Sequence, residues 1–222
     1  MALWHFPRLR ALLFASLSCL CVAVVAHAEG VAISRAILLK LESTYGAGAM
    51  TRLQAWTELM DALPQTSVEE KLLRVNQFFN SLTFVSDEEH WHQVDYWATP
   101  VEFIASNGGD CEDFAIAKFF TLKAVGVEGE QMRLAYVKAL ELNQAHMVLV
   151  YYPAPDKEPL VLDNLVNDIV PASQRKDLQP VYSFNAEGLW QAKQQGQETR
   201  LGTGNDVLMW KTLIQRMKSQ EE

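Results

Sequence analysis

The spacing of apolar positions in the first third of the chain follows a helical period. Apolar residues recur at three- and four-residue intervals, which places them on one face of a helix. We expect helices over residues 31–43 and 50–63, and a third that opens at Ser67, where Glu70 completes a capping-box pattern. The apolar faces of the first two helices consist of Ile33, Ile37, Leu38 and Leu41, and of Leu53, Trp56, Met60 and Leu63.

Two further helices are predicted on either side of a glycine pair. Thr99 followed by Pro100 is typical of a helix start, because proline is preferred at the first helical position. This short helix is expected to end at residues 107–109, where Asn precedes two glycines. The next helix is expected to run from Cys111 to about Val125.

Beyond Gly126 the pattern changes to short apolar runs separated by Asn, Pro and Asp, which is typical of strands. An order of helices followed by strands predicts an α+β fold with an antiparallel sheet rather than an alternating βαβ chain. The expected strands cover residues 133–139, 145–152, 160–163 and 181–184. A last amphipathic helix is expected to pack on the core, with a partner-binding helix as the alternative; its apolar side holds Val207, Trp210, Leu213, Ile214 and Met217.

The N-terminal segment has the pattern of a secretory signal. Arg8 and Arg10 precede an uncharged apolar stretch over 11–25, and Ala26-His27-Ala28 supplies small residues at the positions that a signal peptidase reads. The stretch is shorter than the roughly 20 apolar residues of a membrane span. We therefore expect residues 1–28 to be a cleaved signal peptide and residues 29–222 to form a single exported domain with no membrane insertion after cleavage.

The net charge disfavours some partners. The 222-residue chain carries −8 at pH 7, and loss of a signal with two arginines and no acid would move this to about −10. Such a charge disfavours nucleic acid and anionic lipid and favours a cationic ligand.

Only one of the three cysteines lies outside the predicted signal peptide. Cys19 and Cys21 lie in the predicted signal, so Cys111 would be alone in the exported chain, which could then form no internal disulfide. A single exported thiol is a buried spectator, a site of pairing with another chain, or a nucleophile.

The position of Cys111 favours the nucleophile. Asp110 is the expected N-cap, which puts Cys111 at a helix N-terminus where free backbone N–H groups favour a thiolate and could hold an oxyanion. His146 lies in a predicted strand and Asp163 ends the next one, so a base and its orienting carboxylate could meet the thiol. The alternatives are a core histidine and an aspartate that starts a turn.

Three stretches resemble the bacterial transglutaminase-like cysteine proteinases, in particular the LapG-type periplasmic proteases: YWATPVEFIASNGGDCEDFAIAKFFTLKAVGV, AHMVLVYY and LVLDNLVND. The resemblance implies a papain-like, transglutaminase-like core with Cys111 as nucleophile, His146 as general base and Asp163 as orienting acid. It further implies a periplasmic endoprotease that cleaves a large cell-surface adhesin near an Ala-Ala site and so releases biofilm cells. Control would come from sequestration by the periplasmic domain of an inner-membrane cyclic di-GMP receptor.

The acids around Cys111 predict a cation. Asp110, Glu112 and Asp113 should raise the pKa of the thiol unless positive charge lies nearby, and Ca²⁺ takes several oxygen ligands. The resemblance implies calcium dependence with Asp110 and Glu112 as ligands. Asp113 is a further candidate ligand; for it and for Glu112 the alternative is a simple interaction with the helix dipole.

Other interpretations stay open at the level of sequence. The same three residues would serve a transglutaminase or amidase, and a calcium-binding module that has lost catalysis is a third possibility. His90 and His92 could suggest zinc, but two histidines one residue apart among acids are more typical of a solvated loop. Trp97 either lines the cleft or helps to support an oxyanion, with an ordinary core tryptophan as the alternative.

Overall fold

The computed structural model describes residues 35–192 and 198–221, and the predicted signal peptide lies outside these ranges. The helices are α1 (Arg35–Tyr45), α2 (Ala47–Ala62), α3 (Val68–Asn80), α4 (Asp87–His90), α5 (Pro100–Ser106), α6 (Cys111–Ala124) and α7 (Leu208–Glu221). The 3₁₀ turns are η1 (Gly129–Gln131), η2 (Ala172–Gln174) and η4 (Gly204–Asp206). The strands are β1 (Thr83–Phe84), β2 (Gly108–Gly109), β3 (Met132–Ala139), β4 (Gln144–Tyr151), β5 (Leu160–Leu162), β6 (Val170–Pro171), β7 (Leu178–Phe184), β8 (Leu189–Ala192) and β9 (Glu198–Gly202).

The main sheet is antiparallel, as predicted. Its seven strands lie in the order β6-β5-β4-β3-β7-β8-β9. β3 and β4 form an antiparallel hairpin whose register is continuous along both strands, with Val137 opposite His146. On the other side of β4, Leu149 pairs with Leu162 of β5, so Asp163 follows directly after the last paired residue of that strand.

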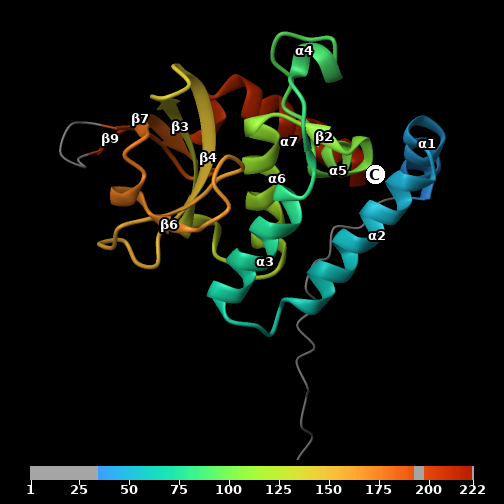
Figure 1. Cartoon of the computed structure of the whole chain (residues 1–222), viewed down its shortest axis with the longest axis horizontal. Coiled ribbons are helices and arrows are strands. Elements are labelled where there is room, and N and C mark those ends of the chain that lie inside the picture. Colours follow the sequence, from blue (N-terminus) through green and yellow to red (C-terminus); the bar gives the residue numbers. More distant parts are fainter. Residues whose placement is uncertain (1–34, 193–197, 222) are drawn as a thin grey trace, which may run out of the picture.

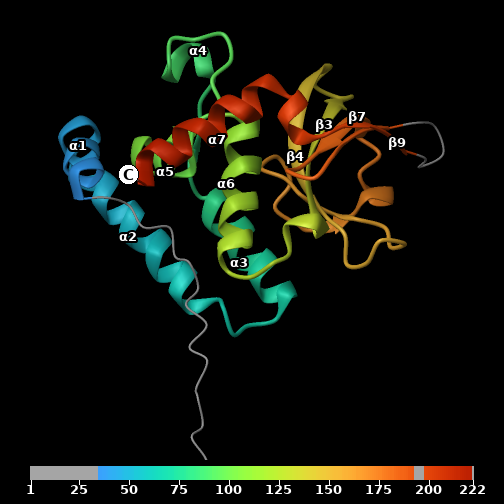
Figure 2. The same ribbon diagram turned by 180° about the vertical axis from the view of Figure 1, so that it is seen from behind.

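Helices cover one face of this sheet (Figure 1). α6 stands between the sheet and the α1–α2 pair, and α7 crosses behind it, as the reverse view in Figure 2 shows. The core therefore lies between α6 and the sheet, where Ile116 and Leu122 meet Leu149 and Phe184, all of them fully buried. This burial of apolar surface fixes α6, and with it Cys111, relative to β4 and β5.

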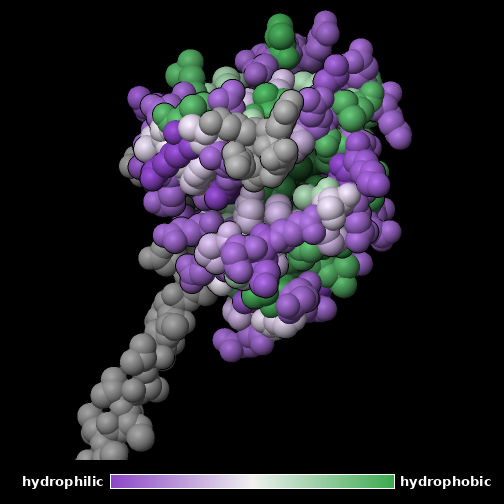
Figure 3. Space-filling model, turned by 90° about the vertical axis from the view of Figure 1, so that its left-hand side faces the viewer, coloured by the Kyte–Doolittle hydropathy of each residue, from purple (hydrophilic) through white to green (hydrophobic). Residues whose placement is uncertain are grey.

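The opposite face of the sheet carries a smaller apolar cluster and a groove with a volume of about 890 Å³. Figure 3 looks onto the sheet side of the molecule, where the surface is hollowed between polar side chains. Because side chains alternate along a strand, Val148 and Val150 face the groove while Met147 and Leu149 face the helices. Arg133 and Arg175 also line the groove.

Most predicted helix boundaries are confirmed. Ser67 accepts a hydrogen bond from the Glu70 N–H at the start of α3. Thr99 and Glu102 form a complete capping box at α5, which ends at Asn107 in the left-handed conformation. The last helix packs on the core as predicted, with Trp210 buried.

None of the helices in residues 35–192 and 198–221 is both long and apolar enough to cross a membrane.

Candidate active site

Cys111 is the first residue of α6, and a short parallel bridge fixes the chain just before it. Gly108 and Gly109 of β2 pair with β1, and the Val85 N–H donates to the Gly109 carbonyl at 2.9 Å. A Cβ atom at position 109 would collide with the Asp113 carboxylate. Glycine is therefore required at 109 for the acidic first turn of α6 to pack against the strand that precedes it.

The thiol of Cys111 lies in an acidic, buried environment. Sγ donates to Glu112 Oε2 at 3.3 Å, and the backbone N–H of Met147 on β4 also hydrogen-bonds to the sulfur. Burial raises the pKa of the thiol, and the charges of Glu112 and Asp110 raise it further, while the Met147 N–H lowers it. As the sequence predicted, these acids oppose formation of the thiolate in the absence of a cation.

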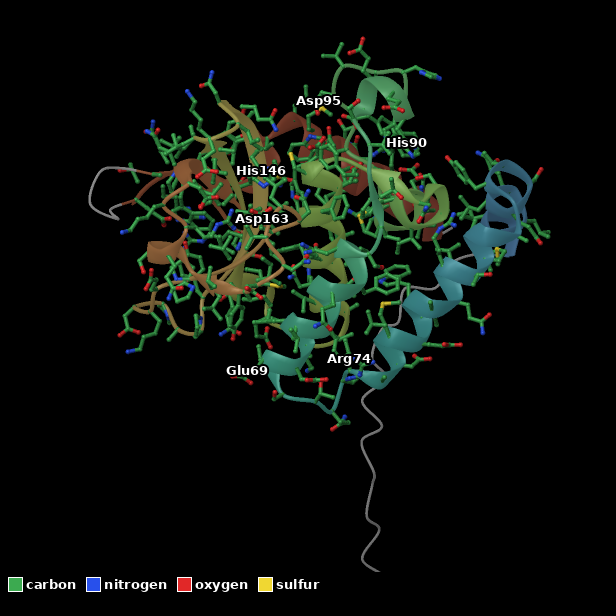
Figure 4. All side chains as sticks on the ribbon, in the orientation of Figure 1. Glu69, Arg74, His90, Asp95, His146 and Asp163 are labelled. Carbon is green, nitrogen blue, oxygen red and sulfur yellow. The ribbon has the colours of Figure 1, made fainter. Side chains whose placement is uncertain are left out.

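His146 and Asp163 form a buried pair, as the sequence predicted. His146 Nε2 lies 2.8 Å from Asp163 Oδ1, and both side chains are at most 3% exposed. Figure 4 shows the two labelled residues next to each other, where β4 and β5 approach α6. Met147 N–H reaches the Cys111 sulfur, so the residue that follows His146 contacts the thiol directly.

Several groups hold Asp163 in place. Its Oδ1 also accepts from the Leu165 N–H at 3.0 Å, and its Oδ2 accepts from Arg175 Nη2 at 2.7 Å. Asn80 of α3 donates to the backbone carbonyl of Asp163 at 2.8 Å. Burial alone would raise the pKa of this carboxyl, but the bond with His146, the His146 charge, the Leu165 N–H and Arg175 lower it to about 2. Asp163 is thus an ionised acceptor at neutral pH.

Five carboxylates gather beside Cys111. Possible ligand atoms lie within 4.8 Å of one another in each of three overlapping groups. These groups are Asp110 with Cys111 and Glu112, Asp87 with Asp110 and Asp113, and Asp87 with Asp95 and Glu112. The structure therefore brings together all three acids predicted from the sequence and adds two from the segment after β1.

The electrostatics of this acidic cluster suit a bound cation. Burial raises the pKa of Asp87 to about 6 and that of Glu112 to about 11, and it raises the pKa of Asp113 well above its usual value. One buried oxygen on each of Asp87, Asp110 and Asp113 has no hydrogen-bond partner among the described residues. Unpaired buried carboxylate oxygens are costly, and a hard cation is the ligand that satisfies them.

Asp110 differs from its predicted role in one respect. It occupies the N-cap position of α6, but its side chain makes no capping hydrogen bond. Instead, its carboxylate interacts with the Glu112 side chain. The carboxylate is thereby directed toward the acidic cluster rather than toward the N–H groups of the helix.

The other sequence candidates have structural explanations. His90 closes the one-turn helix α4 and packs edge-on against Trp91, while His92 is exposed with a positive φ of 55°, in line with the loop interpretation. Trp97 is buried and stacks on Phe184 with ring centroids 5.9 Å apart, and its side chain also hydrogen-bonds to Asp95 of the acidic cluster.

A thiol at a helix N-terminus, in contact with the strand that carries the histidine of a buried histidine–aspartate pair, is the arrangement of the papain-like thiol hydrolases. Residues 54–192 match the family of bacterial transglutaminase-like cysteine proteinases, to which this chain belongs. It is a cysteine peptidase with a transglutaminase-like fold.

Solved structures of Legionella pneumophila LapG are similar over most of the chain. The EGTA-treated form is 48% identical with a TM-score of 0.72, and the match covers 83% of this chain and 98% of that one. The calcium-bound form is 49% identical with a TM-score of 0.70, covering 83% and 99%. The comparison with curated proteins gave no match.

Proposed function

We propose that this protein is a calcium-dependent cysteine endopeptidase in which Cys111 is the nucleophile, His146 the general base and Asp163 the orienting acid. The observation that carries the proposal is the buried 2.8 Å contact between His146 Nε2 and Asp163 Oδ1, together with the thiol at the start of α6 that the N–H of the neighbouring residue, Met147, reaches.

The geometry assigns a different role to each nitrogen of the imidazole ring. Because Asp163 is ionised, it accepts the Nε2–H of His146, which leaves Nδ1 as the basic nitrogen for the thiol. Nδ1 takes the proton from Sγ, and the thiolate attacks the peptide carbonyl carbon. The same proton then passes to the leaving amine as the C–N bond breaks. Water, deprotonated by His146, releases the acyl group and restores the thiol.

The acidic cluster is the proposed calcium site. Asp110, Glu112 and Asp113, together with Asp87 at the start of α4, would hold the ion through carboxylate oxygens, with Asp95 at the edge. When bound, calcium supplies the positive charge that offsets the acids next to the thiol. The unpaired oxygens of Asp87, Asp110 and Asp113 support this site, as does the calcium-bound structure of the LapG relative.

The substrate and the setting follow from the similarity to LapG-type proteases. We infer that the exported, periplasmic protein cleaves a large cell-surface adhesin near an Ala-Ala site and thereby releases biofilm cells. We further infer that the periplasmic domain of an inner-membrane cyclic di-GMP receptor sequesters it. The identity of 48% to LapG over 83% of this chain supports a shared substrate class.

Cleavage of an adhesin fragment tests the reaction. Wild type and Cys111→Ala are each incubated with a fragment that contains an Ala-Ala site, in calcium and in EGTA, with and without a primary amine. New termini that appear only with wild type in calcium support the proposal. Incorporation of the amine without new termini would favour an acyl transferase, and cleavage by Cys111→Ala would refute the nucleophile.

A further inference from the structure

The catalytic carboxylate is held from behind by a second buried ion pair. Arg175 follows the 3₁₀ turn η2 and is 5% exposed. Its Nη2 lies 2.7 Å from Asp163 Oδ2, the oxygen that does not face His146. Each oxygen of the Asp163 carboxylate therefore has its own side-chain partner, His146 on Oδ1 and Arg175 on Oδ2.

Arg175 is itself fixed by Asp177. Its Nε donates to Asp177 Oδ1 at 3.0 Å and its Nη2 to Asp177 Oδ2 at 2.7 Å, which is a two-point contact with one carboxylate. The backbone is fixed as well, because the Arg175 N–H donates to the Ala172 carbonyl and the Leu140 N–H donates to the Asp177 carbonyl. Such fork-like contacts restrict the guanidinium in both distance and orientation.

We propose that Arg175 is a positioning residue of the catalytic site, which orients the Asp163 carboxylate so that Oδ1 faces His146, and that Asp177 anchors Arg175 from the protein surface. We call Asp177, Arg175 and Asp163 the arginine clamp. This inference rests on the proposed roles of His146 and Asp163.

The clamp has a specific physical task. A buried carboxylate with a hydrogen bond on only one oxygen can rotate and can present either oxygen to the imidazole. Occupation of Oδ2 by Arg175 removes that freedom and compensates the charge of Asp163. Lys118 of α6 is also buried near Asp163; burial lowers the pKa of the lysine to about 7, and the charge of Asp163 opposes that change.

The groove on the far side of the sheet makes the inference testable by chemical rescue. Arg175 lines this groove of about 890 Å³, so replacing it with alanine would open a space that a small solute can reach from solvent. A guanidinium ion has the shape and charge of the missing group, whereas urea has a similar shape but no charge.

The experiment compares Arg175→Ala, Arg175→Lys and Arg133→Ala in the full chain. Arg133 is the matched control, because it lines the same groove and pairs with Glu198 rather than with Asp163. For Arg175→Ala we expect kcat on the adhesin fragment to fall about 10- to 100-fold with KM changed less than about threefold, an effect comparable to loss of an outer-shell partner. Millimolar guanidinium should restore at least part of kcat without changing Tm, and urea should not. Arg133→Ala should keep its kcat in every condition.

Arg175→Lys keeps the charge but cannot contact both carboxylates in the same way, so its kcat should fall between wild type and Arg175→Ala. If the alanine variant does not fold, this lysine variant carries the test. Wild-type kcat in a folded Arg175→Lys or Arg175→Ala protein would overturn the proposal. So would a loss of kcat in Arg175→Ala that guanidinium does not reduce.

A readout without substrate separates this inference from the proposed function. The His146 Nε2–H bonded to Asp163 should give a far-downfield proton resonance, which Arg175→Ala should shift or broaden and Arg133→Ala should leave unchanged. If wild type cleaves no adhesin but this resonance responds as expected, the proposed function fails and the clamp stands. An unchanged resonance in Arg175→Ala would refute the clamp.

Discussion

Asp113 offers the sharpest test of the cation site, because its substitution should have opposite effects with and without calcium. Its side chain is fully buried; Oδ1 accepts from the Ala98 N–H at 2.7 Å, and Oδ2 has no hydrogen-bond partner within residues 35–192 and 198–221. Asn at 113 keeps an acceptor for Ala98 but removes the charge. Without calcium, Asp113→Asn should be at least as stable as wild type, since an unsatisfied buried carboxylate costs about 1–3 kcal/mol.

Calcium should reverse this order. A ligand at about 100 times its Kd adds about 2.7 kcal/mol to the free energy of unfolding. For a domain of this size that corresponds to a rise in Tm of about 5–11 °C. Asp113→Asn lacks one proposed ligand, so its rise at the same calcium concentration should be below half of the wild-type value.

Scanning calorimetry at pH 7.5, first in EGTA and then across a calcium titration, measures both effects. Asp61→Asn, an exposed acid on α2, is the matched control, and magnesium controls for general ionic effects. The wild-type rise should shrink at pH 5.5, because protons compete with calcium for Asp87, whose pKa is raised to about 6. A full calcium response in Asp113→Asn would remove Asp113 from the site. Equal wild-type Tm values in EGTA and in calcium would refute the cation site as a whole.

Three further predictions concern single positions. Gly109→Ala should abolish the calcium-induced rise in Tm, because the new Cβ collides with Asp113; a wild-type calorimetric response would contradict this. Burial lowers the pKa of Lys118 from 10.5 to about 7. Between these two pH values the lysine is neutral in the folded state but protonated in the unfolded state, so wild-type stability should rise with pH in that range. Lys118→Met should therefore be more stable than wild type by a few kcal/mol at pH 6 and by less at pH 9.5 in urea unfolding; an equal difference at both pH values would refute the reasoning. Asp163→Asn should lower kcat by roughly 10³- to 10⁴-fold, because His146 loses its orienting acceptor, with binding of the adhesin fragment retained; a loss below about tenfold would contradict the role of Asp163.

The sequence predicted those features that local chemistry determines. Thr99 before Pro100 identifies the start of α5, and Asn107 before two glycines identifies its end just ahead of α6, since caps and left-handed turn residues act within a few residues. The strands around His146 and Asp163 were recognisable because both are short runs of buried apolar residues.

Other features of the fold and the site depend on contacts between residues far apart in the sequence, which no local pattern predicts. Asp87 reaches the acidic cluster from the one-turn helix α4 and Asp95 from the irregular segment that follows it, and both stretches are too short for a periodic pattern to indicate direction. β8 and β9 were not predicted, because these outer strands are only partly buried and lack a clear alternation of apolar and polar residues. Arg175 gave no signal at all: its role comes from a pairing with Asp163 across twelve residues.

The groove on the outer face of the sheet gives the arginine clamp a pharmacological consequence. Arg175 lines that groove and also holds the carboxylate that orients the proposed general base. A compound with a carboxylate that competes with Asp163 for the guanidinium would reduce turnover without occupying the place of the scissile peptide. Its inhibition would be noncompetitive with the substrate, and it would not rely on reactivity toward a thiol, which is the usual source of cross-reaction among cysteine protease inhibitors.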